Sequence, residues 1–174
     1  PISFKPPSTR RAQSMPVKKI PTHAERYCST ICAEKGVTCN NSNEDEEGWD
    51  FFLQFPPTAS RDLPLDMTLA GEACFIQIKS NSGNFRGFRC KLSNALRMAI
   101  SPIATFVVIF GYDKESELRS IHLWHIWEKE IGKILERVRQ QDSKNERDLN
   151  KTKIEFKLAS AIATDEEHIL ELIK

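Results

Sequence analysis

The chain has 174 residues, of which 40% are hydrophobic and 28% are charged. This composition is typical of one folded globular domain and excludes a disordered chain. No apolar run reaches the roughly 18 residues that a membrane helix requires, since Ser101 and Pro102 interrupt the longest one, residues 100–110. Because residues 1–21 also contain no apolar signal core, we expect neither a membrane protein nor a secreted one.

The chain has five cysteines, an odd number, and they do not form two Cys-x-x-Cys pairs. This pattern indicates reduced thiols in a cytoplasmic protein. Cys28 and Cys32 lie one helical turn apart and, with Cys39 and His23, form an alternative set of metal ligands. Small buried side chains are the favoured interpretation, because no tight tetrahedral spacing is present.

The net charge of +1 conceals two basic regions. Residues 1–24 hold five of the 25 bases and none of the 24 acids. Residues 73–112 also contain no carboxylate, and their bases are Lys79, Arg86, Arg89, Lys91 and Arg97. A surface of one sign is suited to an anionic polymer such as nucleic acid.

The first third of the chain begins with a proline-rich basic segment, residues 1–21, which we expect to be a flexible arm. The folded domain then covers residues 22–174. Thr22 and Glu25 have the spacing of a capping box and predict a helix that ends before Gly36. A polar loop follows, and the aromatic run 49–55 and the apolar run 73–79 predict two strands.

The rest of the chain predicts alternating helices and strands. A polar loop at 81–87 precedes a helix at 90–99, and the continuous apolar run 104–110 predicts a strand buried on both faces. Residues 120–127 fit a strand or the start of a helix. A charged amphipathic helix at 128–140, an edge strand at 153–158 and a helix capped by Thr164 complete the order. We therefore expect an α/β fold with a mixed central sheet flanked by helices.

The strongest chemical signal is a polar group at the ends of the two predicted strands 49–55 and 73–79. Asp50, Gln77 and the main-chain carbonyl of Ile78 supply the oxygen ligands that a hard cation such as Mg²⁺ or Mn²⁺ takes. Lys79 shares a strand face with Gln77 and can position a water molecule or offset charge on a phosphoryl group. Glu25 on the first helix offers a further carboxylate.

Each of these residues also has a simpler interpretation. Asp50 and Lys79 fit solvated residues at strand ends, Glu25 is explained by helix capping alone, and Trp49 is explained by packing. The two histidines at 122 and 125 lie on opposite faces of a strand and are interpreted as structural. No phosphate-binding glycine loop of the nucleotide-hydrolysing or dinucleotide-binding type occurs.

The residues Gly48-Trp49-Asp50 and Gln77-Ile78-Lys79 resemble the motif of the PD-(D/E)XK nuclease superfamily, in the variant with Gln at the second acidic position that Mrr-type restriction enzymes share. The wider order over residues 22–158 is similar to the nuclease domains of bacterial anti-phage effectors of the CBASS and Lamassu type. The resemblance implies a restriction-endonuclease-like fold with Asp50, Gln77 and Lys79 as motif residues. Glu25 matches the helical acid of many members.

The resemblance implies a metal-dependent DNA endonuclease acting in bacterial defence. The neutral Gln77 departs from the acidic motif, so a catalytically inactive nucleic-acid-binding module of the same fold is an alternative. A structural subunit that binds a partner protein is a third. Cleavage of both strands of a duplex needs two sites, and we therefore expect a homo-oligomer or a complex with a sensor or ATPase component.

DNA contact is expected along residues 79–91, where small and amide residues are interleaved with bases. The candidate DNA-binding residues are Lys79, Asn84, Arg86, Arg89 and Lys91. A solvated basic loop is the alternative interpretation of this segment.

Overall fold

A computed structural model of the chain describes residues 19–42, 48–57, 70–83 and 85–174. The predicted arm lies almost entirely outside these residues. The described helices are α1 (Ile20–Glu34), α2 (Leu92–Ile100), α3 (Glu128–Ser143) and α4 (Ile169–Ile173), with a short 3₁₀ turn at Leu158–Ser160. The strands are β1 (Thr38–Asn41), β2 (Phe51–Gln54), β3 (Ala73–Ser82), β4 (Gly87–Lys91), β5 (Thr105–Tyr112), β6 (Leu118–His125), β7 (Lys153–Lys157) and β8 (Ile162–Thr164).

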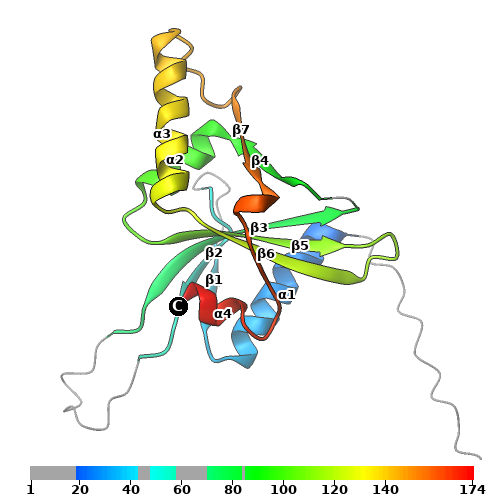
Figure 1. Ribbon diagram of the computed structural model, residues 1–174. Coiled ribbons are helices and arrows are strands. Elements are labelled where there is room, and N and C mark those ends of the chain that lie inside the picture. The colour runs from blue at the N-terminus through cyan, green and yellow to red at the C-terminus, as the bar shows by residue number, and fades with distance from the viewer. Residues whose placement is uncertain (1–18, 43–47, 58–69, 84) are drawn as a thin grey trace, which may run out of the picture.

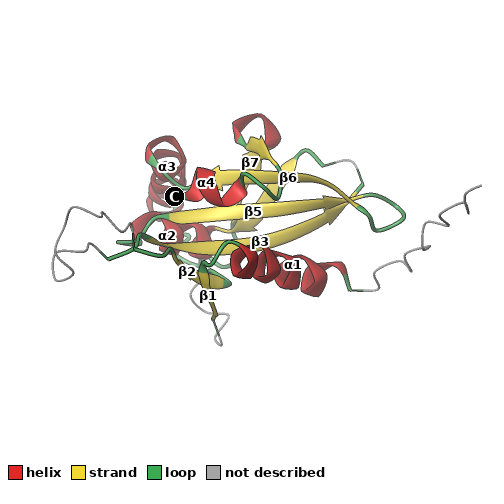
Figure 2. Cartoon of the chain, turned by 90° about the horizontal axis from the view of Figure 1, so that it is seen from below, coloured by secondary structure: helices red, strands yellow, loops and turns green. Residues whose placement is uncertain are grey.

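Six of these strands form one central sheet in the order β1-β2-β3-β5-β6-β8. Only β3 and β5 run parallel, and the other described neighbours are antiparallel. The remaining two strands, β4 and β7, pair in a separate antiparallel ribbon. Figure 2 shows β3, β5 and β6 side by side as the long strands of the sheet. The expected mixed sheet with flanking helices is confirmed.

The sheet is covered on both faces, with α1 and α4 on one side and α2, α3 and the β4–β7 ribbon on the other (Figure 1). Every residue of β5 is buried, as the continuous apolar run predicts. Alternate residues of β5 divide between the two cores: Val108 and Phe110 pack under α1, whereas Val107 and Ile109 pack under α2 and α3. The same alternation on β3 decides which of its side chains face the candidate site.

The two predicted helix caps are wrong. The first helix begins at Ile20 with Lys19 as its N-cap and no side-chain cap, because Pro21 in the first turn has the fixed φ of a helix and lacks an N–H that would need a partner. Thr22 therefore lies inside α1. At the other end of the chain, Thr164 closes β8, and Asp165 accepts the backbone N–H groups of the following turn.

The sequence pattern does not predict three of the strands. Residues 38–41 and 162–164 form β1 and β8 although neither segment has an alternating apolar pattern, and residues 87–91 form β4 just before α2. The undecided segment 120–127 is mostly strand, because β6 pairs with the fully buried β5 along its length.

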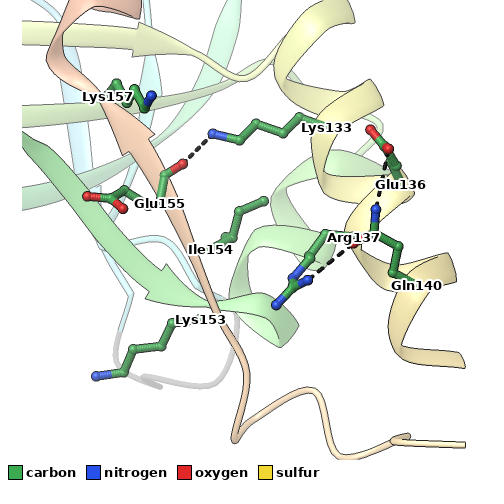
Figure 3. Close-up of a pocket in the computed structure, with 8 residues that line it drawn as sticks. All are labelled: Lys133, Glu136, Arg137, Gln140, Lys153, Ile154, Glu155 and Lys157. Carbon is green, nitrogen blue, oxygen red and sulfur yellow. Dashed lines mark hydrogen bonds between the residues drawn. The ribbon is translucent and has the colours of Figure 1, made fainter. Parts of the chain in front are cut away.

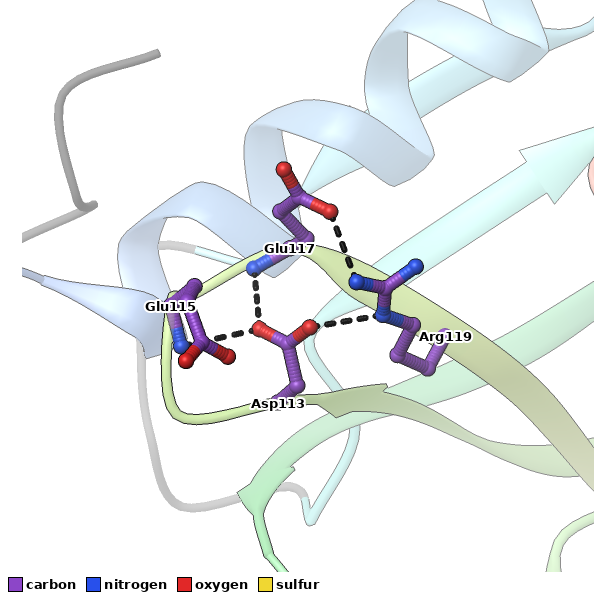
Figure 4. Close-up of polar contacts among 4 residues, drawn as sticks. All are labelled: Asp113, Glu115, Glu117 and Arg119. Atoms are coloured by element: carbon purple, nitrogen blue, oxygen red, sulfur yellow. Dashed lines mark hydrogen bonds and ion pairs between the residues drawn. The ribbon is translucent and has the colours of Figure 1, made fainter. Parts of the chain in front are cut away.

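The β5–β6 hairpin is closed by a polar network around Asp113 (Figure 4). Asp113 Oδ1 accepts the backbone N–H groups of Glu115 at 3.0 Å and Glu117 at 2.9 Å. Asp113 Oδ2 accepts Arg119 Nε at 2.6 Å, and Arg119 Nη2 donates to the Glu117 carboxylate at 2.8 Å. The backbone N–H of Glu117 and the Arg119 guanidinium together hold the pKa of Asp113 below its ordinary value.

All five cysteines are free thiols, and four of them are buried. The alternative metal set is not assembled, because His23 Nδ1 lies 3.0 Å from the Tyr112 hydroxyl and no group of three or more His, Cys, Asp or Glu within the described ranges is placed to hold a metal. None of the helices formed by the described residues is both long and apolar enough to cross a membrane.

Candidate metal centre and nucleic-acid interface

Asp50 lies directly before β2 and is tied to β3 by two hydrogen bonds. Its backbone N–H donates to the Ile76 carbonyl at 2.8 Å, and its Oδ2 accepts the Ile78 backbone N–H at 2.5 Å. The regular β2–β3 pairing ends at Phe51 and Ile76, so Asp50 lies just beyond it. The structure therefore places the Asp50 carboxylate against the backbone of β3 at Ile78, the residue that follows Gln77.

Gln77 is a buried polar residue in the middle of β3, with 8% of its surface exposed. It alternates with Ile76 and Ile78, which pack under α1, and so projects toward the α2 side of the sheet. Its Oε1 atom is fully buried and has no hydrogen-bond partner in the part of the chain that the structure describes. Burying an amide oxygen without a hydrogen bond costs about 1–3 kcal/mol of free energy. A bound cation or water would offset that cost.

The Ile78 carbonyl lies at the edge of β3 on the same side as Asp50. In a strand, the N–H and C=O of one residue point toward the same neighbour, and the Ile78 N–H points to Asp50. The β2–β3 pairing ends at Phe51 and Ile76, whereas the β3–β5 pairing continues to Ser82. Beyond Ile76, β3 therefore has an edge without a strand partner among the described residues, and the Ile78 carbonyl and the Asp50 carboxylate lie at that edge.

Lys79 projects from the same face of β3 as Gln77, two residues further along the strand. It is half-buried near Cys90 of β4, whose thiol pKa burial raises to about 11 while the Lys79 ammonium opposes the rise. Within the described segments, the Lys79 side chain forms neither a hydrogen bond nor an ion pair, so no carboxylate there neutralises its ammonium group.

Glu25 is not brought into contact with this group. It lies on α1, whose apolar side packs against the face of the sheet opposite Gln77. In the part of the chain that the structure describes, its carboxylate forms no hydrogen bond with Gln77 or Lys79. The capping explanation for Glu25 also fails, since the helix begins five residues earlier. Glu25 therefore stays a proposed ligand at most through water.

The second buried polar atom without a partner, among the described residues, is Nε2 of His125. Its ring stacks on Phe106 at 4.4 Å between centroids, and Phe106 belongs to the core under α1. Burial lowers the pKa of His125, which favours its neutral form. His122 projects to the opposite face beside Phe85, as predicted, and the two histidines do not form one site.

The predicted DNA-binding segment, residues 79–91, begins in the last residues of β3 and ends in β4. Phe88 and Cys90 point into the core, so Arg89 and Lys91 point outward, and Arg86 is exposed just before the strand. Asn84 lies outside the described residues. Arg89 forms an ion pair with Glu155 at 3.3 Å, whereas Lys91 faces Lys153 across the ribbon.

Sequence reasoning did not select the bases on β7. Lys153 and Lys157 lie opposite Lys91 and Gly87 in the ribbon and extend the basic face of β4. Their alternation with Ile154 and Phe156 predicts an outward-facing row, but the partner strand is distant in the sequence. Trp49 has the expected packing role, since its ring stacks on Phe75 at 4.4 Å.

No model of a known protein family matches the chain, and no curated protein matches it either.

Proposed function

We propose that this protein is a metal-dependent DNA endonuclease whose site is formed by Asp50, Gln77, Ile78 and Lys79. The observation that carries the proposal is the buried Oε1 of Gln77, which has no hydrogen-bond partner among the described residues. It belongs to the strand whose Ile78 N–H binds the Asp50 carboxylate. A bound cation would supply the partner that this oxygen lacks.

The donor set fits Mg²⁺ or Mn²⁺, because a carboxylate, an amide oxygen and a main-chain carbonyl are all hard oxygen ligands. Asp50, Gln77 and Ile78 would hold the ion. When bound, it would polarise a phosphodiester and acidify a water molecule. The Lys79 ammonium would bind a phosphoryl oxygen, orient the attacking water and offset charge that develops on phosphorus.

The order of elements supports a restriction-endonuclease-like fold. The resemblance implies a helix with an acid, a strand with Asp, a strand with Gln-x-Lys, a helix and an apolar strand, and the chain has α1, β2, β3, α2 and β5 in that order. The parallel pairing of β3 with β5 across α2 keeps the Gln-x-Lys strand in the middle of the sheet. We extend the proposal to a cytoplasmic effector of bacterial anti-phage defence.

Cleavage of a duplex also requires a second site on the opposite strand. A homo-oligomer, or a complex with a sensor or ATPase component, would supply it. This part of the proposal rests on the geometry of the substrate.

The test is cleavage of supercoiled plasmid with Mg²⁺ or Mn²⁺, compared with an EDTA control. The variant Lys79→Ala removes the proposed catalytic ammonium, and Lys114→Ala serves as the matched control because that lysine is exposed in the β5–β6 turn. We expect wild type and Lys114→Ala to nick the plasmid only with metal, and Lys79→Ala to be at least about 100-fold slower. Equal cleavage by all three proteins would overturn the assignment of Lys79.

The neutral Gln77 and the absence of a Glu25 contact favour a second candidate, a nucleic-acid-binding module without turnover. It predicts metal-independent DNA binding by wild type and no cleavage under any metal. Plasmid that is retarded in a gel but never nicked would select this candidate over the nuclease.

A further inference from the structure

A groove of about 390 Å³ lies between α3 and β7, outside the candidate metal centre. Figure 3 shows its lining: Lys133 and Arg137 extend from α3 toward β7, whereas the side chains of Lys153 and Glu155 point away from the helix. The charged residues that line it are Lys133, Glu136, Arg137, Lys153, Glu155 and Lys157. Four of the six are bases.

The acids of the groove do not neutralise these bases. The Glu155 carboxylate is paired with Arg89, its cross-strand partner in β4, and Glu136 accepts a hydrogen bond from Gln140. Among the ion pairs of the described residues, none includes Lys133, Arg137, Lys153 or Lys157. These four bases therefore have no ion-pair partner among the described residues, and the groove carries more bases than acids.

Two of the bases are fixed by uncharged partners. Lys133 Nζ donates to the main-chain carbonyl of Glu155 and lies 4.9 Å from the centroid of the Phe156 ring. Arg137 Nη1 donates to Gln140 Oε1 at 3.1 Å (Figure 3). Cationic groups held in place by a carbonyl, an amide and a ring lose little side-chain entropy when an anion binds.

A like-charged pair continues the basic surface toward the candidate site. Lys91 of β4 and Lys153 of β7 are direct cross-strand partners, an arrangement that destabilises an isolated ribbon. Lys91 immediately precedes α2, and Asn94 of α2 packs against Gly48, two residues before Asp50. The bases thus extend from the neighbourhood of Asp50 across the ribbon to α3.

We propose that this groove binds the phosphate backbone of the duplex DNA that the candidate site would cleave. A polyanion would neutralise the Lys91–Lys153 pair and the fixed bases at once, and its repeating charges match a surface that extends over two strands and a helix. The inference rests on the proposed function, since it assigns a second contact region to the same substrate.

The test measures affinity for a short DNA duplex in EDTA at several salt concentrations. The double variant Lys153→Gln/Lys157→Gln is compared with Lys35→Gln/Lys114→Gln, which removes the same charge from exposed lysines at the end of α1 and in the β5–β6 turn. We expect the groove variant to bind about tenfold more weakly and its salt slope to fall by roughly 2, as for two lost phosphate contacts, while the control stays close to wild type. Thermal unfolding of both variants checks that each is folded.

Other outcomes overturn the inference in distinguishable ways. If the groove variant and the control bind DNA alike, the groove is not a DNA contact, whether or not wild type cleaves plasmid. If wild type does not bind duplex DNA at all, the proposed function fails with it. If polyglutamate binds wild type more tightly than DNA does and the groove variant loses it, the groove belongs to an acidic protein partner.

Discussion

The backbone N–H of Ile78 donates to Asp50 Oδ2 at 2.5 Å, which ties the carboxylate before β2 to the strand that carries Gln77 and Lys79. A second bond, from the Asp50 N–H to the Ile76 carbonyl, fixes the same residue from its backbone. The relative positions of the candidate site residues are therefore set by strand register. A site on rigid strands holds its groups more precisely than one on a loop.

Substitution of Asp50 separates this structural bond from the proposed chemistry. In Asp50→Asn the side-chain oxygen can still accept the Ile78 N–H, so the free energy of unfolding should change by less than about 1 kcal/mol. Asp50→Ala leaves the Ile78 N–H without that acceptor and should cost about 1–2 kcal/mol. Both variants lose the carboxylate, and both should lose metal-dependent plasmid cleavage. Urea denaturation and the plasmid assay measure the two effects. Cleavage retained by Asp50→Asn would contradict the metal assignment.

Gln77→Leu is expected to be stable but inactive. The apolar side chain removes a buried oxygen that has no partner, so the free energy of unfolding without metal should stay within about 1 kcal/mol of wild type or rise. Thermal unfolding without and with Mg²⁺ measures the stability of each protein and its gain on metal binding. Wild type should gain stability with Mg²⁺, and Gln77→Leu should gain none. A loss of more than about 2 kcal/mol in the absence of metal would show that Gln77 has a structural partner after all.

Gln77→Glu provides the complementary change. A carboxylate at this buried position raises the ligand charge and should tighten Mg²⁺ binding, and it should make unfolding more dependent on the metal. Without Mg²⁺ the variant should be less stable than wild type near neutral pH, because a buried charge without a partner is costly. Calorimetric titration with Mg²⁺ measures the affinity. Equal affinity in wild type and Gln77→Glu would argue against a metal at this position.

Local pattern predicts the centre of the sheet well and its edges poorly. The apolar run 104–110 predicts β5 because burial on both faces leaves no polar position, and the structure has every residue of β5 buried. Residues 38–41, Thr-Cys-Asn-Asn, contain no apolar alternation, and β1 forms because its backbone pairs with β2. An edge strand is specified by its neighbour's unpaired backbone groups, which the sequence of the strand itself does not show.

The sequence likewise predicts some residues of the candidate site and its basic surface but misses others. The segments that hold Asp50 and Gln77 are neighbours, as the pattern predicts, because β2 and β3 meet in an antiparallel pair. Lys153 faces Lys91 because β4 and β7, which are distant in the sequence, pair in a ribbon outside the central sheet. Periodicity shows which face a residue lies on within its own strand, but it does not identify the partner strand.

The hairpin network predicts an acid-dependent loss of stability. The pKa of Asp113 is lowered in the folded protein, so its charged form contributes stability that is fully present above the ordinary aspartate pKa of about 3.9. That contribution is lost as the pH falls through the lower pKa of the folded state. Asp113→Asn removes it, and the variant's Tm should fall less steeply than that of wild type below pH ~4. Melting curves from pH ~2 to ~7 measure the difference.

Asp148→Asn is a control of the same type. Its pKa is also lowered, chiefly by a hydrogen bond from Lys151, but the pair lies outside the hairpin. The two substitutions should act independently, so their effects on Tm should add. If the Tm of Asp113→Asn fell as steeply with decreasing pH as that of wild type, the network around Asp113 would make no net contribution to stability.

Gly87 at the start of β4 is expected to tolerate no side chain. Its φ is +141°, and a Cβ atom there would overlap the main-chain carbonyl of Phe156, its neighbour in β7. Backbone cannot rotate away as a flexible side chain would, so Gly87→Ala should lower the free energy of unfolding by about 2–4 kcal/mol. Because the ribbon carries Lys91 and Lys153, DNA affinity should fall as well. Urea denaturation and the duplex binding assay measure the two losses.

The same substitution at Gly132 should act in the opposite direction. Gly132 is exposed within α3, and a Cβ atom there would meet nothing within 4 Å. Alanine restricts the unfolded chain and has the higher helix propensity, so Gly132→Ala should raise the free energy of unfolding by about 0.5–1 kcal/mol. DNA affinity should stay at the wild-type value, since no charge of the groove changes. Stability gained at Gly132 and lost at Gly87 would locate the constraint in the β4–β7 pairing, whereas similar effects at both positions would contradict it.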